Sequence, residues 1–150
     1  METNSGLIWV VLIGGAIGGA ILCLLAFLLS RFRNDLAGRT ALATGLFTAA
    51  GAYFGFAVMA PVSRIWILIE LLQCVAFGVF GLKGWDSTRG WQSAKWLALG
   101  WALHPIWDFG LHYVGPGSFA PWVYVIACLS FDWVVAAYIL IAYRVFRLGD

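Results

Sequence analysis

The sequence predicts an all-α, polytopic membrane protein with five transmembrane helices, its N-terminus outside and its C-terminus in the cytoplasm. Two observations predict this class. Of the 150 residues, 63% are hydrophobic and only 11% are charged, whereas a soluble domain is about half apolar and roughly a quarter charged. The apolar residues also gather in long runs separated by polar or Pro/Gly segments. Because a soluble core of this size could not bury so much apolar surface, we expect a single transmembrane domain over residues 1–150.

The five helices are predicted from the lengths of the apolar runs. Crossing a hydrocarbon core of about 30 Å takes roughly 20 helical residues, since the backbone must satisfy its polar groups internally. The first run is too long for a signal peptide and lacks a positively charged leader, so we expect it to stay as a helix. The second and third runs are separated so narrowly, at Pro61, that they should form a tight hairpin. The runs cover residues 6–30, 40–60, 62–82, 96–114 and 121–143, with 31–39, 83–95 and 115–117 as further connections.

The orientation is predicted from Lys and Arg, which in short loops stay on the cytoplasmic side. With five crossings, eight basic residues fall on one side and Arg64 alone falls on the other. The net charge is only +2 and the basic residues form no patch, so nucleic acid is not expected as a partner. The eight are Arg31, Arg33, Arg39, Lys83, Arg89, Lys95, Arg144 and Arg147.

The first two helices have the composition of a scaffold. Gly14 and Gly18, and likewise Gly15 and Gly19, are spaced four residues apart in the first helix. Such small-residue faces allow the backbones of two helices to approach closely in a membrane. The second helix carries a similar series of small residues, namely Gly45, Ala49, Ala52 and Gly55.

The last three helices carry ionisable residues at membrane depth, where each such residue needs a partner or a function. In the fourth helix, His104, Asp108 and His112 recur every four residues and share one face. The third helix contributes Glu70 and the fifth contributes Asp132. From the rise of 1.5 Å per residue, Glu70 and Asp108 lie about 10 Å and His104 and Asp132 about 15 Å below the outer helix ends. We therefore expect Glu70, His104, Asp108 and Asp132 to line one pocket in the outer half of the bundle.

The motif His104-Pro-Ile-Trp-Asp108-Phe-Gly-Leu-His112, followed by Tyr124, Cys128 and Asp132 at four-residue intervals, is similar to a known pattern. It resembles an uncharacterised family of small bacterial integral membrane proteins that pair a His-x-x-Trp-Asp…His helix with a Tyr…Cys…Asp helix. The resemblance covers roughly the second half of the chain and implies a location in the bacterial cytoplasmic membrane. The resemblance implies no activity.

One interpretation of the polar residues is a metal site. His104, Asp108 and His112 offer nitrogen and oxygen ligands that zinc, iron or manganese accepts, which makes a divalent metal a candidate cofactor. An open coordination position on zinc would generate a hydroxide for hydrolysis. No complete metalloenzyme motif is present in the sequence.

A second interpretation is acid/base chemistry on a membrane lipid or another lipophilic small molecule. Asp108 would be the central catalytic residue with Glu70 and Asp132 beside it, and His104 would relay the proton. Positive charge on the substrate would be stabilised by aromatic rings in the membrane. The protein would then be a lipid or terpenoid isomerase or cyclase. The predicted substrate-binding rings are Trp101, Trp107, Tyr124 and Trp133.

Two further interpretations stay open. The carboxylates and His104 could form the proton or ion relay of a transporter, for which a homo-oligomer or a larger membrane complex would be needed. Alternatively, the polar groups could hydrogen-bond one another and only specify how the helices pack, as in a structural subunit. Gln73, Cys74 and Cys128 are interpreted as neighbours of the site and not as part of its chemistry.

Overall fold

The computed structural model describes residues 5–114 and 119–145, and this part of the chain contains helices and no strands. All five predicted helices are present. They are α1 (Ser5–Phe32), α2 (Asp35–Met59), α3 (Arg64–Trp85), α4 (Trp91–Val114) and α5 (Trp122–Leu140); a short 3₁₀ helix η1 (Ser87–Arg89) precedes α4, and a π-helical turn η2 (Ile141–Val145) extends α5.

The two polar connections are shorter than the sequence predicted. α2 begins at Asp35 instead of residue 40, because the Asn34 side chain caps the helix by accepting a 2.8 Å hydrogen bond from the amide of Ala37. α4 likewise begins at Trp91 instead of residue 96. The predicted loops 31–39 and 83–95 are therefore largely helical, and Arg39 lies inside α2.

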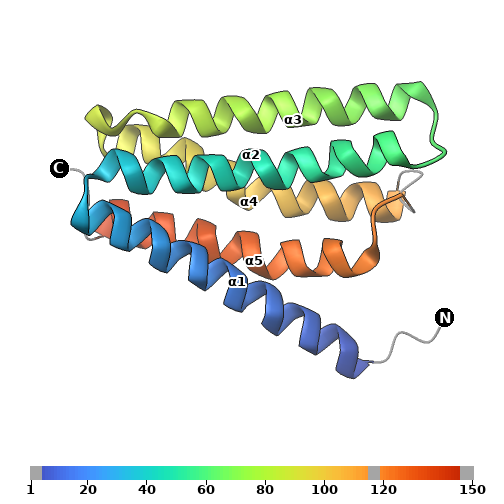
Figure 1. The fold of residues 1–150 in the computed structure, drawn as a ribbon, viewed down its shortest axis with the longest axis horizontal. Coiled ribbons are helices and arrows are strands. Elements are labelled where there is room, and N and C mark those ends of the chain that lie inside the picture. Colours follow the sequence, from blue (N-terminus) through green and yellow to red (C-terminus); the bar gives the residue numbers. More distant parts are fainter. Residues whose placement is uncertain (1–4, 115–118, 146–150) are drawn as a thin grey trace.

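The helices run up and down in sequence order (Figure 1), and their contacts close them into a ring. Each helix packs against the next one along the chain, and α5 packs against α1. The predicted hairpin of α2 and α3 is confirmed, with a turn at residues 60–63. The first residues of α1 lie at the same end of the bundle as this turn, and the last residues of α5 lie at the opposite end.

α1 contacts α5 through the predicted glycines. A Cβ atom added at Gly15 would lie 2.3 Å from the carbonyl oxygen of Ala127, and one added at Gly19 would lie 2.6 Å from that of Phe131. No larger residue fits either position without moving α1. A Cβ atom at Gly18 would lie 3.2 Å from the Phe131 ring of α5, whereas one at Gly14 would meet nothing within 4 Å, so only the Gly15 and Gly19 pair meets the backbone of α5.

The surface of the bundle is that of a membrane protein. Four helices are long and apolar enough to cross a membrane: α1, α2, α3 and α5 extended by η2. α4 has 24 residues and is long enough, but its polar residues make it less apolar. Large apolar side chains are exposed along the helices, among them Ile17 at 56%, Leu72 at 60% and Ile106 at 57%. A soluble monomer rarely exposes so much contiguous apolar surface.

Candidate functional site

The bundle has two hydrophobic cores, and a layer of polar side chains separates them. One core contains Leu46, Trp101 and Val135, and the other contains Tyr53, Leu111 and Val125. Along α4 and α5, the buried residues between these two levels are polar except for Pro105. The layer contains Glu70 and Gln73 of α3, His104 and Asp108 of α4, and Cys128 and Asp132 of α5, all of them buried.

His104 lies at the centre of the polar layer and contacts two carboxylates. Its Nδ1 atom is 2.8 Å from Oδ2 of Asp132 and 3.5 Å from Oδ2 of Asp108. The first distance is that of a hydrogen bond between α4 and α5. Because Asp108 follows His104 by one helical turn, it approaches the same ring from the same helix face. All three side chains are shielded from the surface.

Cys128 completes a group of four metal-ligating side chains. One ligand atom each from His104, Asp108, Cys128 and Asp132 lies within 4.8 Å of every other. The sequence interpretation treated Cys128 only as a neighbour, yet the four-residue spacing of Cys128 and Asp132 matches that of His104 and Asp108. This doubled spacing on two adjacent helices was the signal that could have identified it.

Glu70 and Gln73 of α3 lie on another side of the layer. Neither oxygen of Glu70 and neither polar atom of the Gln73 side chain has a hydrogen bond within the part of the chain that the structure describes. The indole of Trp107 and the ring of His104 are near the Glu70 carboxyl, without a hydrogen bond of ordinary geometry. Buried polar side chains in proteins are normally hydrogen-bonded, so these two have capacity for an additional partner.

An open apolar groove between α3 and α4 leads to this side of the layer. Its volume is about 760 Å³. Gln73 and Trp107 line it directly, and so does Phe77, whose ring meets the imidazole of His104 edge to face at 5.1 Å. The other lining residues are Trp66, Ile69, Ala76, Leu103, Ile106, Gly110 and Leu111. The groove therefore joins the apolar surface of the bundle to residues that touch the polar layer.

The four predicted substrate-binding aromatic residues have different surroundings. Trp107 lines the groove. Trp101 is fully buried and donates a 3.2 Å hydrogen bond to the carbonyl of Leu42, as a core residue does. Tyr124 donates its hydroxyl to the carbonyl of Ala49 and packs against the rings of Tyr53 and Phe56. Trp133 is 51% exposed on the outside of α5. The four rings therefore do not form one cage.

The predicted metal ligands His104, Asp108 and His112 do not come together as a set. His104 and Asp108 are in contact, but His112 is outside the group of four. Eight residues of helix separate His112 from His104 by about 12 Å along the axis, which is too far for a shared ion. His104 and Asp108 share one face of α4, as the spacing predicted, and the distance along the helix excludes His112.

A buried arginine, which the sequence predicted to lie in a loop, connects several elements at the end of the bundle where α2 begins. Arg39 is fully buried. Its guanidinium donates to the Asp35 carboxylate at 2.6 Å, the Ser93 hydroxyl at 2.7 Å and the carbonyl of Gly90 at 3.0 Å. It also lies 4.4 Å from the centre of the Tyr143 ring, and the Tyr143 hydroxyl donates to Asp35. One side chain thus joins α2, the start of α4 and η2.

The neighbouring turn between α3 and α4 is organised by Asp86. Its carboxylate accepts hydrogen bonds from the Thr88 hydroxyl at 2.6 Å and the Thr88 amide at 3.0 Å. These two bonds lower the pKa of Asp86. The ionised carboxylate begins η1 and so positions the backbone carbonyls that Arg39 uses.

Fold and site together define a membrane-type helical protein with a buried cluster of His, Asp, Cys and Asp. The chain belongs to a family of unknown function, DUF6010, whose model matches residues 14–144. The family match covers the helices that carry the polar layer and agrees with the resemblance seen in the sequence. No curated protein and no solved structure matches the chain.

Proposed function

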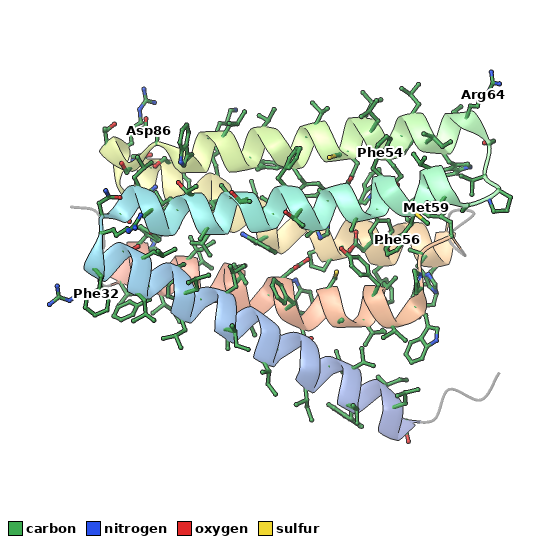
Figure 2. All side chains as sticks on the ribbon, viewed as in Figure 1. Phe32, Phe54, Phe56, Met59, Arg64 and Asp86 are labelled. Carbon is green, nitrogen blue, oxygen red and sulfur yellow. The ribbon has the colours of Figure 1, made fainter. Side chains whose placement is uncertain are left out.

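We propose that all five helices cross a bacterial cytoplasmic membrane, with the first residues of α1 outside and the end of η2 in the cytoplasm. α4 packs between α3 and α5, so it shares the depth of two apolar helices, and its polar residues are buried between them. The basic residues support the direction. All the predicted cytoplasmic ones that are described lie near the end of the bundle with Phe32 and Asp86, and Arg64 lies at the other end with Met59 (Figure 2). Arg147 lies outside the described residues.

We further propose that the protein binds a lipophilic molecule in the α3–α4 groove and transforms it by proton transfer at the polar layer. The observation that carries this proposal is Glu70, a fully buried carboxyl without a hydrogen bond in the described chain, beside an open apolar groove. The apolar walls fit a hydrocarbon body, and Gln73 offers both a donor and an acceptor to its polar group.

The proton-transfer role falls to Glu70 and not to Asp108, which the sequence favoured. Asp108 and Asp132 engage His104 on the α5 side, whereas Glu70 neighbours the groove residue Trp107. A carboxyl group kept out of water can hold a proton and release it to a bound substrate. Isomerisation or cyclisation of a lipid or terpenoid needs only such transfers, which makes this the reaction class that the site fits best.

The first test is whether a lipophilic molecule co-purifies with the protein and occupies the groove. Gly110 lines the groove, and a Cβ atom added there meets nothing within 4 Å. Gly110→Phe should fill the groove without straining the fold, and Gly14→Phe is a matched control on α1, where the space is also open. Native mass spectrometry and lipid extraction should find the molecule in the wild type and in Gly14→Phe and lose it in Gly110→Phe. Equal occupancy in the two variants would refute the groove.

The second test measures proton transfer at Glu70 and does not require the product to be identified. The co-purifying molecule is incubated with the protein in D₂O, and deuterium incorporation is measured by mass spectrometry. The wild type should exchange hydrogen at a carbon of the ligand, and Glu70→Gln should bind the molecule without exchanging it. If Glu70 serves only helix packing, Glu70→Gln will exchange as the wild type does, and its bundle will be equally stable or more so.

A further inference from the structure

We propose that His104, Asp108, Cys128 and Asp132 bind one divalent metal ion of the zinc class between α4 and α5. The inference rests on the proposed function because it concerns the same polar layer. It gives a role to the residues of that layer on α4 and α5, whereas the proposed proton transfer takes place at Glu70 on α3. Each of the four residues offers a ligand atom within 4.8 Å of the other three, and all four are buried.

The cluster has more polar atoms than partners. Both oxygens of Asp108, Oδ1 of Asp132 and Nε2 of His104 lack a hydrogen bond of ordinary geometry in the described ranges, and the Cys128 thiol lies near the Asp108 carboxyl. His104, Asp108 and Asp132 are all fully buried. Carboxylate oxygens in a low-dielectric interior are costly without a compensating charge. A cation at the centre of the cluster would give the oxygens of both Asp residues that charge.

The kinds of donor atom identify the class of metal. A thiolate and an imidazole, combined with two carboxylates, suit zinc and similar transition metals, whereas magnesium and calcium prefer oxygen ligands alone. Two ligand pairs, each spaced by one helical turn, face each other from α4 and α5. This is a regular way for two helices to enclose an ion.

The spacing of the ligand atoms requires only small side-chain movements. Around a tetrahedral zinc with bonds of about 2.0–2.3 Å, neighbouring ligand atoms lie roughly 3.3–3.7 Å apart. His104 Nδ1 is already 3.5 Å from Asp108 and must move slightly away from Asp132, now at 2.8 Å. Four protein ligands fill the coordination shell, so the ion would join α4 to α5 and leave proton transfer to Glu70.

Binding would exchange the ion for protons. Cys128 loses its thiol proton and His104 Nδ1 gives up the proton that it shares with Asp132, and both protons pass to solvent. If His104 starts as the imidazolium, the ion brings two positive charges and two protons leave, so the net charge of the cluster is unchanged. No redox change is needed.

The test uses the full-length protein in detergent and has a readout other than activity. Chelator-treated wild-type protein is titrated with Co²⁺, and the thiolate-to-cobalt charge-transfer band is followed in the near ultraviolet. We expect the band to saturate at about one cobalt per chain. Cys128→Ser should lose the band. Cys74→Ser is the matched control, since Cys74 is an equally buried thiol on α3 outside the cluster, and it should keep the band.

Absence of the band in the titrated wild type would overturn the inference, as would an equal band in Cys128→Ser. The wild-type titration needs no variant, so a variant that fails to fold does not leave the question open. Elemental analysis separates this inference from the proposed function. One metal per chain without a bound lipophilic molecule would support the metal site and refute ligand binding in the groove. A bound lipophilic molecule in metal-free protein that gives no cobalt band would support ligand binding in the groove and refute the metal site.

Discussion

The most specific prediction about the fold is that Arg39 holds together the end of the bundle that contains the turns before α2 and α4. Arg39→Ala removes one partner of a buried ion pair, which typically costs about 3–5 kcal/mol. Asp35 retains 18% exposure of its side chain, so water can offset part of the loss. The lost contact with the Tyr143 ring, 4.4 Å away, adds roughly 0.5–2 kcal/mol. We therefore expect a net loss of about 3–5 kcal/mol.

Thermal unfolding in detergent, followed by tryptophan fluorescence, measures this loss. By the scaling for chains of this size, the midpoint should fall by roughly 6–20 °C. Arg33→Ala is the matched control, because Arg33 is exposed in the turn just before α2 and should shift the midpoint by less than about 2 °C. Arg39→Lys should give an intermediate loss, since a lysine ammonium cannot reproduce the planar fork of donors. Equal midpoints for Arg39→Ala and Arg33→Ala would refute the reasoning.

The remaining predictions concern helix packing, topology and the groove. Gly15→Val should destabilise the bundle by about 1–3 kcal/mol through overpacking against α5. Gly14→Val should not, because of these two glycines only Gly15 meets the backbone of another helix. Equal unfolding midpoints for the two variants would contradict this packing of α1 against α5. Cysteines introduced at Ser5 and Thr88 should react with an impermeant thiol reagent from opposite sides of the membrane, and labelling from one side would exclude five crossings. Gln73→Leu removes a buried amide without a partner in the described chain and should stabilise the ligand-free protein by about 1–3 kcal/mol while weakening ligand binding. Wild-type stability together with full ligand occupancy would contradict its role in the groove.

The sequence predicted the helices well, and it correctly placed the polar residues of α4 and α5 at a common level of the bundle, because both depend on local rules. The length of an apolar run determines where a membrane helix can exist, and the rise per residue determines how deep Asp108 or Asp132 lies within it. For the same reason, residues four apart on α4 were correctly expected to share a face. These rules use only position along one helix.

The features that the sequence analysis missed depend mainly on how the helices are rotated and which distant residues they bring together. Arg39 was predicted to lie in a loop because the start of α2 was taken from the apolar run, although Asn34 is a local capping signal for an earlier start. The carbonyls that surround the guanidinium belong to Gly84 and Gly90, which are distant in the sequence.

Trp133 and Trp101 were both predicted to lie within the membrane, yet in the structure Trp133 is exposed and Trp101 is a core residue. This difference in exposure depends on how α4 and α5 are rotated about their axes. The same rotation brings Cys128 into the cluster.

The most direct test of the central claim is an experimental structure of the protein in a lipid bilayer. We predict elongated density in the groove between α3 and α4, with one end within hydrogen-bonding distance of the Gln73 amide and adjacent to the Glu70 carboxyl. A groove closed by Trp107 and Phe77, or density there no better ordered than the lipid along the exposed face of α1, would contradict it.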